Sequence, residues 1–260
     1  MKIPIFQLDA FTNRRFKGNP AAVCPLGNWI GTPMMQKIAA ENNLPETAFF
    51  VREKDGFHIR WFTPDIEVDL CGHATLAAAA VAFEKLDYNK KVIEFNSKSG
   101  LLKVRKEKNQ YILDFPTDEI TQLKEEKEIV EAIGRVPDEI WKGKYDHMLI
   151  YGSEVDILAI KPDFNQLAKF TQRGVIVSAP GNSTDFVSRF FAPSAGIDED
   201  PVTGSAHTSL TPYWSKRLNK KVLSAIQVSS REGILNCRHL KDRVEIAGEV
   251  VFYLEGIVEF

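Results

Sequence analysis

The chain has 260 residues, a net charge of −2 and a pI of about 6.2, so no basic field points to a nucleic-acid partner. Its composition, 44% hydrophobic and 26% charged, is that of a globular protein with one large domain or two smaller ones. The three cysteines, Cys24, Cys71 and Cys237, are widely spaced, which favours neither a disulfide framework nor a zinc ribbon. The N-terminus does not resemble a signal peptide, and the longest apolar run, residues 74–83, is too short to cross a bilayer. We therefore predict a soluble cytoplasmic protein.

The first half of the chain predicts strands interrupted by two helices. Thr32, as an N-cap hydroxyl before a proline, predicts a helix that runs to about Asn43. Glu46 follows in the loop before the next strand. After Gly72 the segment ATLAAAAVAFEKL is apolar nearly all round, so we expect sheet or helices to cover this helix on every side. Short apolar runs predict strands at residues 3–11, 21–24, 48–51, 57–62, 92–95, 101–106 and 111–115.

The second half begins near residues 116–119, Pro-Thr-Asp-Glu, which predict a boundary between two lobes, residues 1–116 and 117–260. A charged helix follows, LKEEKEIVEAIG, with Gly134 as its C-cap. Beyond it, DFNQLAKFTQRGVIVSAPGNSTDFVSRFF predicts a helix, a strand, a turn and another strand. The last strands, residues 244–246 and 250–254, complete the second lobe or cross back to the first.

One stretch occurs twice in the chain. RWFTPDIEVDLCGHATL from Arg60 aligns with RFFAPSAGIDEDPVTGSAHT from Arg189 when three residues, 199–201, are taken as an insertion. Each copy predicts a strand, a proline-containing turn, an acidic loop and a turn of small residues that opens a helix. The matches Phe49–Val175, Arg60–Arg189, Gly72–Gly204 and Gly100–Gly233 have offsets of 126, 129, 132 and 133 residues, which rise in order as expected for a duplication.

We therefore predict an α+β fold of two pseudo-symmetric lobes, each a curved, mostly antiparallel sheet around a central apolar helix. The two helix starts read Gly72-His73-Ala74 and Gly204-Ser205-Ala206. Such starts leave backbone N–H groups free, with the positive end of the helix dipole behind them. We expect the two starts to hold one anionic ligand between them.

Glu46 is the candidate general acid/base. A glutamate in a loop is most often a solvated carboxylate. Two features argue against that interpretation here. First, the repeat aligns Gln172 with Glu46, so the carboxylate belongs to one lobe only. Second, the apolar neighbours in LPETAFF favour a partly desolvated acid.

His73 and Asp200 are the other candidate catalytic residues. His73 lies in the first turn of the apolar helix, where the dipole should keep its ring neutral and able to donate to a carbonyl. Asp200 falls in the three-residue insertion, close to the second helix start. The spacing of Cys71 and His73 matches no common zinc site, so we predict no metal. The sequence has no G-x-S-x-G, G-x-G-x-x-G or Walker motif.

Four ordered motifs, FKGNPAAVC, LPETAFF, DLCGHATLA and EDPVTGSAH, resemble those of the PhzF family of phenazine biosynthesis over nearly the whole chain. The resemblance implies a diaminopimelate-epimerase-like fold with the active site in the cleft between the lobes, and isomerase chemistry without a cofactor. It further implies a small carboxylate-bearing substrate, no nucleic-acid or membrane partner, and a homodimer. The implied catalytic residues are Glu46, His73 and Asp200, and the implied substrate-binding residues are Asn19, Gly72, Gly204, Ser205 and Ala206.

Two alternatives compete with this interpretation. The same fold hosts racemases that use two facing cysteines, and Cys71 lies where one of them would be. The duplication puts Thr203 at the matching place, and a threonine hydroxyl cannot replace a thiolate as a base at neutral pH. The other alternative is a small-molecule-binding protein of the same fold without catalytic activity.

Overall fold

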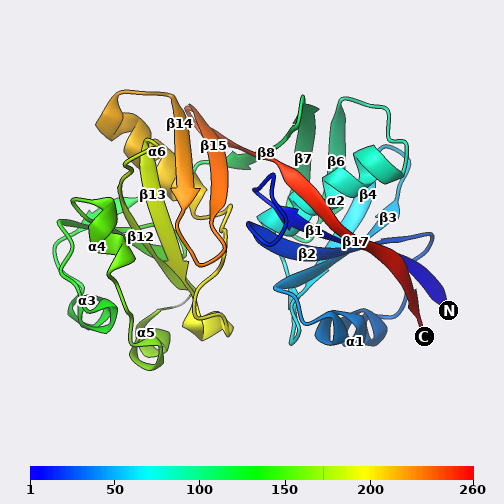
Figure 1. Ribbon diagram of the computed structural model, residues 1–260, viewed down its shortest axis with the longest axis horizontal. Helices are drawn as coiled ribbons and strands as arrows, with labels where there is room; N and C mark the ends of the chain where they lie inside the picture. The colour runs from blue at the N-terminus through cyan, green and yellow to red at the C-terminus, as the bar shows by residue number, and fades with distance from the viewer. Residues whose placement is uncertain (172) are drawn as a thin grey trace. The chain divides into compact units, whose positions relative to one another are not determined.

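The computed structural model describes residues 1–171 and 173–260. The chain divides into two compact units, which we call unit 1 (Met1–Asp114 with Ala247–Phe260) and unit 2 (Phe115–Ile246). Each is built from twisted, hydrogen-bonded strands and a few helices, so the predicted α+β class is confirmed (Figure 1). In the described part of the chain, no helix is both long and apolar enough to cross a membrane.

Unit 1 contains two helices, α1 (Thr32–Asn42) and α2 (Gly72–Lys85). Strand β2 pairs in parallel with β3, β3 antiparallel with β4, β4 in parallel with β6, and β6 antiparallel with β7. The last strand, β17, pairs antiparallel with β1 and so returns the end of the chain to unit 1. The strands are β1 (Lys2–Ala10), β2 (Asn19–Leu26), β3 (Glu46–Arg52), β4 (Phe57–Phe62), β5 (Glu67–Val68), β6 (Val92–Ser97), β7 (Gly100–Glu107), β8 (Gln110–Pro116) and β17 (Val250–Glu259).

Helices cover both faces of the sheet in unit 1. All eight residues of β2 are buried, as expected for a strand with neighbours on both faces. Met35 and Ile38 of α1 pack against Phe49 of β3 on one face. Helix α2 contacts β2, β1 and β3, and every residue from His73 to Ala82 is buried, so the prediction that this apolar helix is enclosed is confirmed.

The start of α1 differs from the prediction by one residue. Gly31 is the N-cap, and Thr32 is already the first helical residue. The Thr32 hydroxyl therefore makes no capping hydrogen bond and instead accepts one from Nη2 of Arg60, at 3.0 Å.

Unit 2 repeats the strand order of unit 1. Strand β11 pairs in parallel with β12, β12 antiparallel with β13, β13 in parallel with β14, and β14 antiparallel with β15. This is the order found for β2, β3, β4, β6 and β7, so the predicted duplication is confirmed. The elements are β9 (Thr121–Leu123), α3 (Lys127–Ile133), β10 (Glu139–Lys142), β11 (Asp146–Ile150), α4 (Glu154–Leu158), α5 (Phe164–Phe170), β12 (Gly174–Pro180), β13 (Phe186–Phe191), the 3₁₀ turn η1 (Pro193–Ala195), α6 (His207–Leu218), β14 (Val222–Gln227), β15 (Gly233–Leu240) and β16 (Arg243–Gly248).

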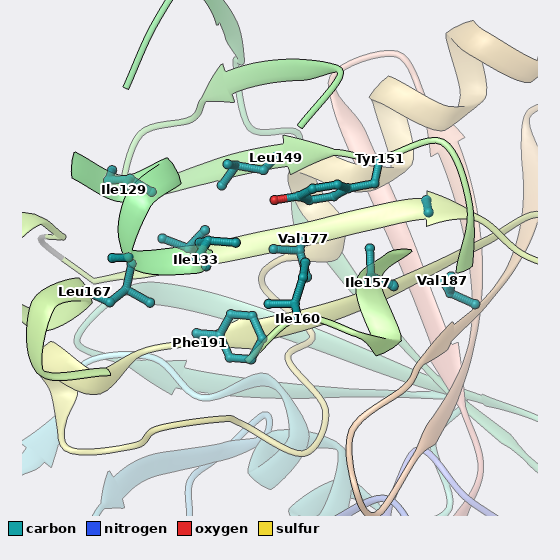
Figure 2. Close-up of a cluster of buried hydrophobic side chains, with 13 residues drawn as sticks. Ile129, Ile133, Leu149, Tyr151, Ile157, Ile160, Leu167, Val177, Val187 and Phe191 are labelled. Atoms are coloured by element: carbon teal, nitrogen blue, oxygen red, sulfur yellow. The ribbon is translucent and has the colours of Figure 1, made fainter. Parts of the chain in front are cut away.

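Alternation along β12 separates two cores in unit 2. Val177 points into a cluster that includes Ile133 of α3 and Leu167 of α5 (Figure 2). Ser178 points to the opposite face, where its hydroxyl accepts a hydrogen bond from Nε1 of Trp214 on α6, at 2.9 Å. The last residues of α6 are exposed, so only unit 1 has the central helix that is apolar all round. The helix of unit 2 instead buries one face, which includes Leu210 and Trp214.

The position of the insertion also differs from the prediction. Arg60 forms a bidentate ion pair with Glu67, and Arg189 forms the same pair with Glu199. These glutamates are 132 residues apart, the offset of the two helix-opening glycines, so the extra residues lie before Glu199. Asp200 is therefore not part of the insertion.

The strand register corrects the predicted counterpart of Glu46. Phe49 pairs with Arg60, and Val177 pairs with Arg189, so β3 and β12 are related by an offset of 128 residues rather than 126. The residue equivalent to Glu46 is then Gly174, while the predicted counterpart, Gln172, lies outside the described residues. A Cβ at Gly174 would lie 2.5 Å from the ring of Phe190 and 2.7 Å from a backbone oxygen, so this position of unit 2 excludes a carboxylate.

Candidate functional site

The side chains of Asn19, Glu46, Cys71 and His73 in unit 1 lie where three elements begin. Asn19 is the first residue of β2 and Glu46 is the first residue of β3 rather than part of the preceding loop. Because these strands are parallel, both begin at the same edge of the sheet. Helix α2 opens at this edge with Gly72 and His73, directly after Cys71.

His73 contacts the other three side chains. Its Nε2 lies 3.0 Å from Oε2 of Glu46, and its Nδ1 lies 3.2 Å from Nδ2 of Asn19 and 3.6 Å from Sγ of Cys71. The side chains of His73 and Glu46 are only 6% and 13% exposed. When the Asn19 amide donates to Nδ1, the remaining ring proton lies on Nε2 and faces the carboxylate.

The facing atoms of Glu46 and His73 keep hydrogen-bonding capacity. Both Oε2 of Glu46 and Nε2 of His73 are buried, and within the described residues their contact at 3.0 Å is an ion pair without the alignment of a hydrogen bond. Buried polar atoms without a hydrogen bond are costly and uncommon in folded proteins. A ligand that brings a polar group to this edge would satisfy them.

The surroundings of His73 favour its charged form, contrary to our expectation of a neutral ring. Burial acts to lower the pKa of His73, but its close acidic neighbours Cys71 and Glu46 raise it well above its ordinary value. The carboxylate is 3.0 Å away, whereas the helix dipole is a partial charge spread over the first turn. The close carboxylate therefore outweighs the dipole.

All three thiols of the chain are buried and protonated at neutral pH. Burial, followed by the Glu46 charge, raises the pKa of Cys71 to about 11, although His73 partly opposes this. Burial raises the pKa of Cys24 and of Cys237 to about 12. A thiolate base at Cys71 would need a lowered pKa instead.

The same cluster contains the donors that a metal ion would need. Ligand atoms of Glu46, Cys71 and His73 all lie within 4.8 Å of one another. Zinc accepts such a mixed oxygen, sulfur and nitrogen set, with the thiol deprotonated. The sequence spacing predicted no metal here, whereas among residues 1–171 and 173–260 these three side chains are close enough together to hold one.

The remaining predicted residues lie in unit 2. Helix α6 begins at His207, not at Gly204, with Ala206 as its N-cap. Gly204, Ser205 and Ala206 form the turn before it, and the carbonyl of Gly204 accepts from the N–H of His207 at 3.0 Å. The predicted helix start was therefore three residues too early.

Asp200 belongs to a network around this turn. Its Oδ2 accepts a hydrogen bond from the Thr203 hydroxyl at 2.5 Å, and its backbone carbonyl accepts one from Nε2 of Gln227 at 2.8 Å. Oε1 of Gln227 accepts from the N–H of Thr203, also at 2.8 Å. Gln227 was not predicted from the sequence, although its place after Leu223 and Ala225 in the alternation of β14 marks it as a buried polar residue.

A second network in unit 2 was also missed. Nε and Nη2 of Arg173 donate to the two carboxylate oxygens of Asp146, and Nη1 donates to the Ser205 hydroxyl at 3.3 Å. No local motif marks Arg173, because its partners are 27 and 32 residues away in the chain.

The structure thus places the predicted residues in two groups. Asn19, Glu46, Gly72 and His73 lie together in unit 1. Asp200, Gly204, Ser205 and Ala206 lie in unit 2. The expectation that both groups share one cleft stays a prediction.

Comparisons with known proteins agree along the whole chain. A family model described as phenazine biosynthesis-like protein, PhzC-PhzF, matches residues 8–256. An uncharacterized isomerase of Pseudomonas aeruginosa is 49% identical over 98% of both chains. The crystal structure of a PhzF-family protein from Enterococcus faecalis superimposes with a TM-score of 0.97 at 45% identity and full coverage of both chains. A predicted epimerase from P. aeruginosa, 18% identical with a TM-score of 0.77 over 98% of this chain and 99% of that one, shares the fold.

Proposed function

The chain belongs to the phenazine biosynthesis-like (PhzC-PhzF) protein family, and from this premise we propose that it is an isomerase that needs no cofactor. It moves a proton between carbons of a small carboxylate-bearing metabolite, with Glu46 as the general acid/base. The observation that carries the proposal is the buried contact between Glu46 and His73 at the start of α2. Several relatives carry the name isomerase, which supports the reaction class.

Glu46 acts in two steps. In the first, its carboxylate takes a proton from a substrate carbon, so that an O–H bond forms and the C–H bond breaks. The electron pair of the C–H bond moves into the adjacent unsaturated system of the substrate. In the second, the carboxylic acid returns the proton to another carbon of the same molecule. Because the donor and the acceptor are one group, no net charge or oxidant is required.

His73 supports the charged form of Glu46 in this cycle. A cationic ring 3.0 Å from Oε2 stabilises the carboxylate before the proton moves and again after it is returned. On the opposite side of the ring, Nδ1 lies 3.2 Å from the side-chain amide of Asn19. We assign His73 to orienting and polarising roles and the proton transfer itself to Glu46.

The two-thiol racemase is the weaker candidate. The Cys71 thiol has a pKa of about 11, and Thr203 occupies the place of a second thiol. The Thr203 hydroxyl already donates to Asp200. Neither group is prepared to accept a proton from carbon at neutral pH.

A screen in heavy water tests the proposal. The purified chain is incubated with a panel of small unsaturated and α-substituted carboxylic acids, and deuterium at carbon is followed by mass spectrometry and NMR. We expect at least one acid to incorporate solvent deuterium and to rearrange or epimerise. Acids that bind in calorimetry without any exchange would instead support the non-catalytic binding protein.

Assembly and location stay predictions from the family resemblance. A homodimer is expected, and sedimentation equilibrium of the purified chain measures it directly. A cytoplasmic location is expected as well, and fractionation of cells that express the natural gene tests it.

A further inference from the structure

In both units a charged side chain at or just before the start of a strand contacts a residue that follows a glycine near the start of a helix. In unit 1, Glu46 at the start of β3 meets His73, which follows Gly72. In unit 2, Arg173 precedes β12 by one residue and meets Ser205, which follows Gly204. The register makes Gly174 the equivalent of Glu46, so Arg173 is its chain neighbour. The two contacts therefore lie at neighbouring rather than equivalent positions of the two copies, and their chemistry differs.

Arg173 is held rigidly in this position. Two of its nitrogens donate to both carboxylate oxygens of Asp146, whose side chain is only 3% exposed. The guanidinium also lies over the rings of Tyr145 and Phe190, with its carbon 5.4 and 5.8 Å from the ring centroids. A bidentate pair together with aromatic contacts fixes the planar group in both direction and distance.

The remaining contact sets the direction of the Ser205 hydroxyl. A guanidinium carries only donors, so Nη1 donates and the Ser205 oxygen accepts. The hydroxyl proton of Ser205 then stays available, and the nearby cation makes it a stronger donor. Within residues 1–171 and 173–260, the Ser205 hydroxyl has no other side-chain partner.

We infer that Arg173, held by Asp146, is a positioning residue that fixes the Ser205 hydroxyl as a hydrogen-bond donor to a carboxylate oxygen of the ligand. Because Asp146 offsets the charge of Arg173, the arginine acts through Ser205 rather than as a free cation. The inference rests on the proposed function only for the identity of the anion, the carboxylate of the substrate.

Acetate, the simplest such carboxylate, is the probe. Its binding to the intact chain is followed by ¹H–¹⁵N NMR, through the Nε–H signal of Arg173 and the amide signals of residues 204–206. We expect saturable shifts in the natural chain and an affinity about tenfold lower in Ser205→Ala, since a charge-assisted hydrogen bond is lost. Ser205→Thr keeps the hydroxyl and should bind acetate within about threefold of the natural chain.

Arg173→Met alone would leave the buried Asp146 unpaired and could unfold the unit. The test therefore uses the pair Arg173→Met with Asp146→Asn, which removes both charges together. We expect the same tenfold loss, and no further loss when Ser205→Ala is added. Arg217→Met is the matched control. Like Arg173, Arg217 donates to a carboxylate and to a side-chain hydroxyl, here those of Glu139 and Tyr213, but it does not contact Ser205.

Two results would overturn the inference. One is an acetate affinity equal to that of the natural chain in the Arg173–Asp146 pair variant. The other is an additional tenfold loss of affinity in the triple variant, which would mean that Arg173 does not act through Ser205. Acetate binding in all of these variants is measured without any proton transfer by Glu46. The inference and the proposed isomerase can therefore fail separately.

Discussion

Glu46 lies beside two other groups that could take part in proton transfer, the ring of His73 and the thiol of Cys71. The pKa values of these two groups indicate which roles each can have. The pKa of His73 is raised well above its ordinary value, which favours a cationic ring beside the carboxylate. The pKa of Cys71 is about 11, so its thiol remains neutral. A neutral thiol and a cationic ring can donate to Glu46 or stabilise it, but neither is a ready base. The carboxylate is the group of this cluster that can accept a proton from carbon at neutral pH.

Replacing Cys71 tests this division at the residue scale. We expect Cys71→Ser to keep most of the exchange activity, because the thiol is a neighbour of the base and not the base itself. We also expect slow alkylation by iodoacetamide at pH 7.5, since only a very small fraction of a thiol with a pKa of about 11 is ionised there. Cys237→Ser is the matched control, with a thiol that is also buried and protonated. Near-complete loss of activity in Cys71→Ser at unchanged stability would point to the thiol mechanism.

At the scale of elements, both candidate groups depend on parallel strands that begin at one edge of a sheet. In unit 1 the starts of β2 and β3 bring Asn19 and Glu46 to the start of α2. In unit 2 the starts of β11 and β12 bring Asp146 and Arg173 to the turn before α6. A parallel pair needs a long crossover connection, so the residues that meet are far apart in the chain.

This explains which parts of the site the sequence predicted. Glu46, His73 and the enclosed helix α2 are marked by local patterns, namely a short motif and an unbroken apolar run. Arg173 and Gln227 are placed by strand register, which a single sequence does not reveal. The same reason accounts for the error of two residues in the counterpart of Glu46. The misplaced insertion arose because acidic residues are common near Glu199, and only its ion pair with Arg189 identifies the equivalent of Glu67.

Several elements of unit 2 were not predicted at all. Strands β9, β10 and β11 and the short helix α4 lie within residues 121–158, where the one uninterrupted apolar run of four residues, 148–151, contains the end of β11. Their structure comes from packing around the core of Figure 2 rather than from local propensity.

The buried histidine at the start of α6, His207, should make the stability of the protein depend on pH. His207 is fully buried, Nδ1 of its ring donates to the carbonyl of Thr203 at 2.9 Å, and burial lowers its pKa to about 4. The unfolded chain, with an ordinary value of 6.5, binds this proton first as the pH falls. The contribution of neutral His207 to the free energy of unfolding is therefore complete above about pH 6.5. It is lost as the pH falls towards 4, and the loss is on the order of 3 kcal/mol.

Urea unfolding at several pH values between 7 and 4 measures this effect. We expect His207→Gln to be less stable at pH 7 but to lose about 3 kcal/mol less than the natural chain on acidification. His239→Gln, at a partly exposed histidine of the same unit, should follow the natural curve. Equal acid slopes for the natural chain and His207→Gln would show that His207 is not the group responsible.

At the scale of the whole molecule, duplication has produced two units with one strand order and different chemistry. Unit 1 carries an acid next to a histidine, and unit 2 carries an arginine next to a serine. The return of β17 to pair with β1 gives unit 1 the strand that ends the chain. A duplicated fold can specialise in this way because each copy keeps its own core while the residues at the strand starts are free to change.

The central claim is that Glu46 moves the proton. Glu46→Gln keeps the size of the side chain and most of its hydrogen bonding but cannot accept a proton, whereas Glu41→Gln, at an exposed glutamate of α1, serves as the matched control. The decisive measurement is the rate of deuterium incorporation at carbon in heavy water, with the acid found in the screen at saturating concentration. The account predicts a rate about 10² to 10⁴ times lower for Glu46→Gln, with calorimetric affinity nearly unchanged and full activity in Glu41→Gln. Full exchange activity in Glu46→Gln would contradict it.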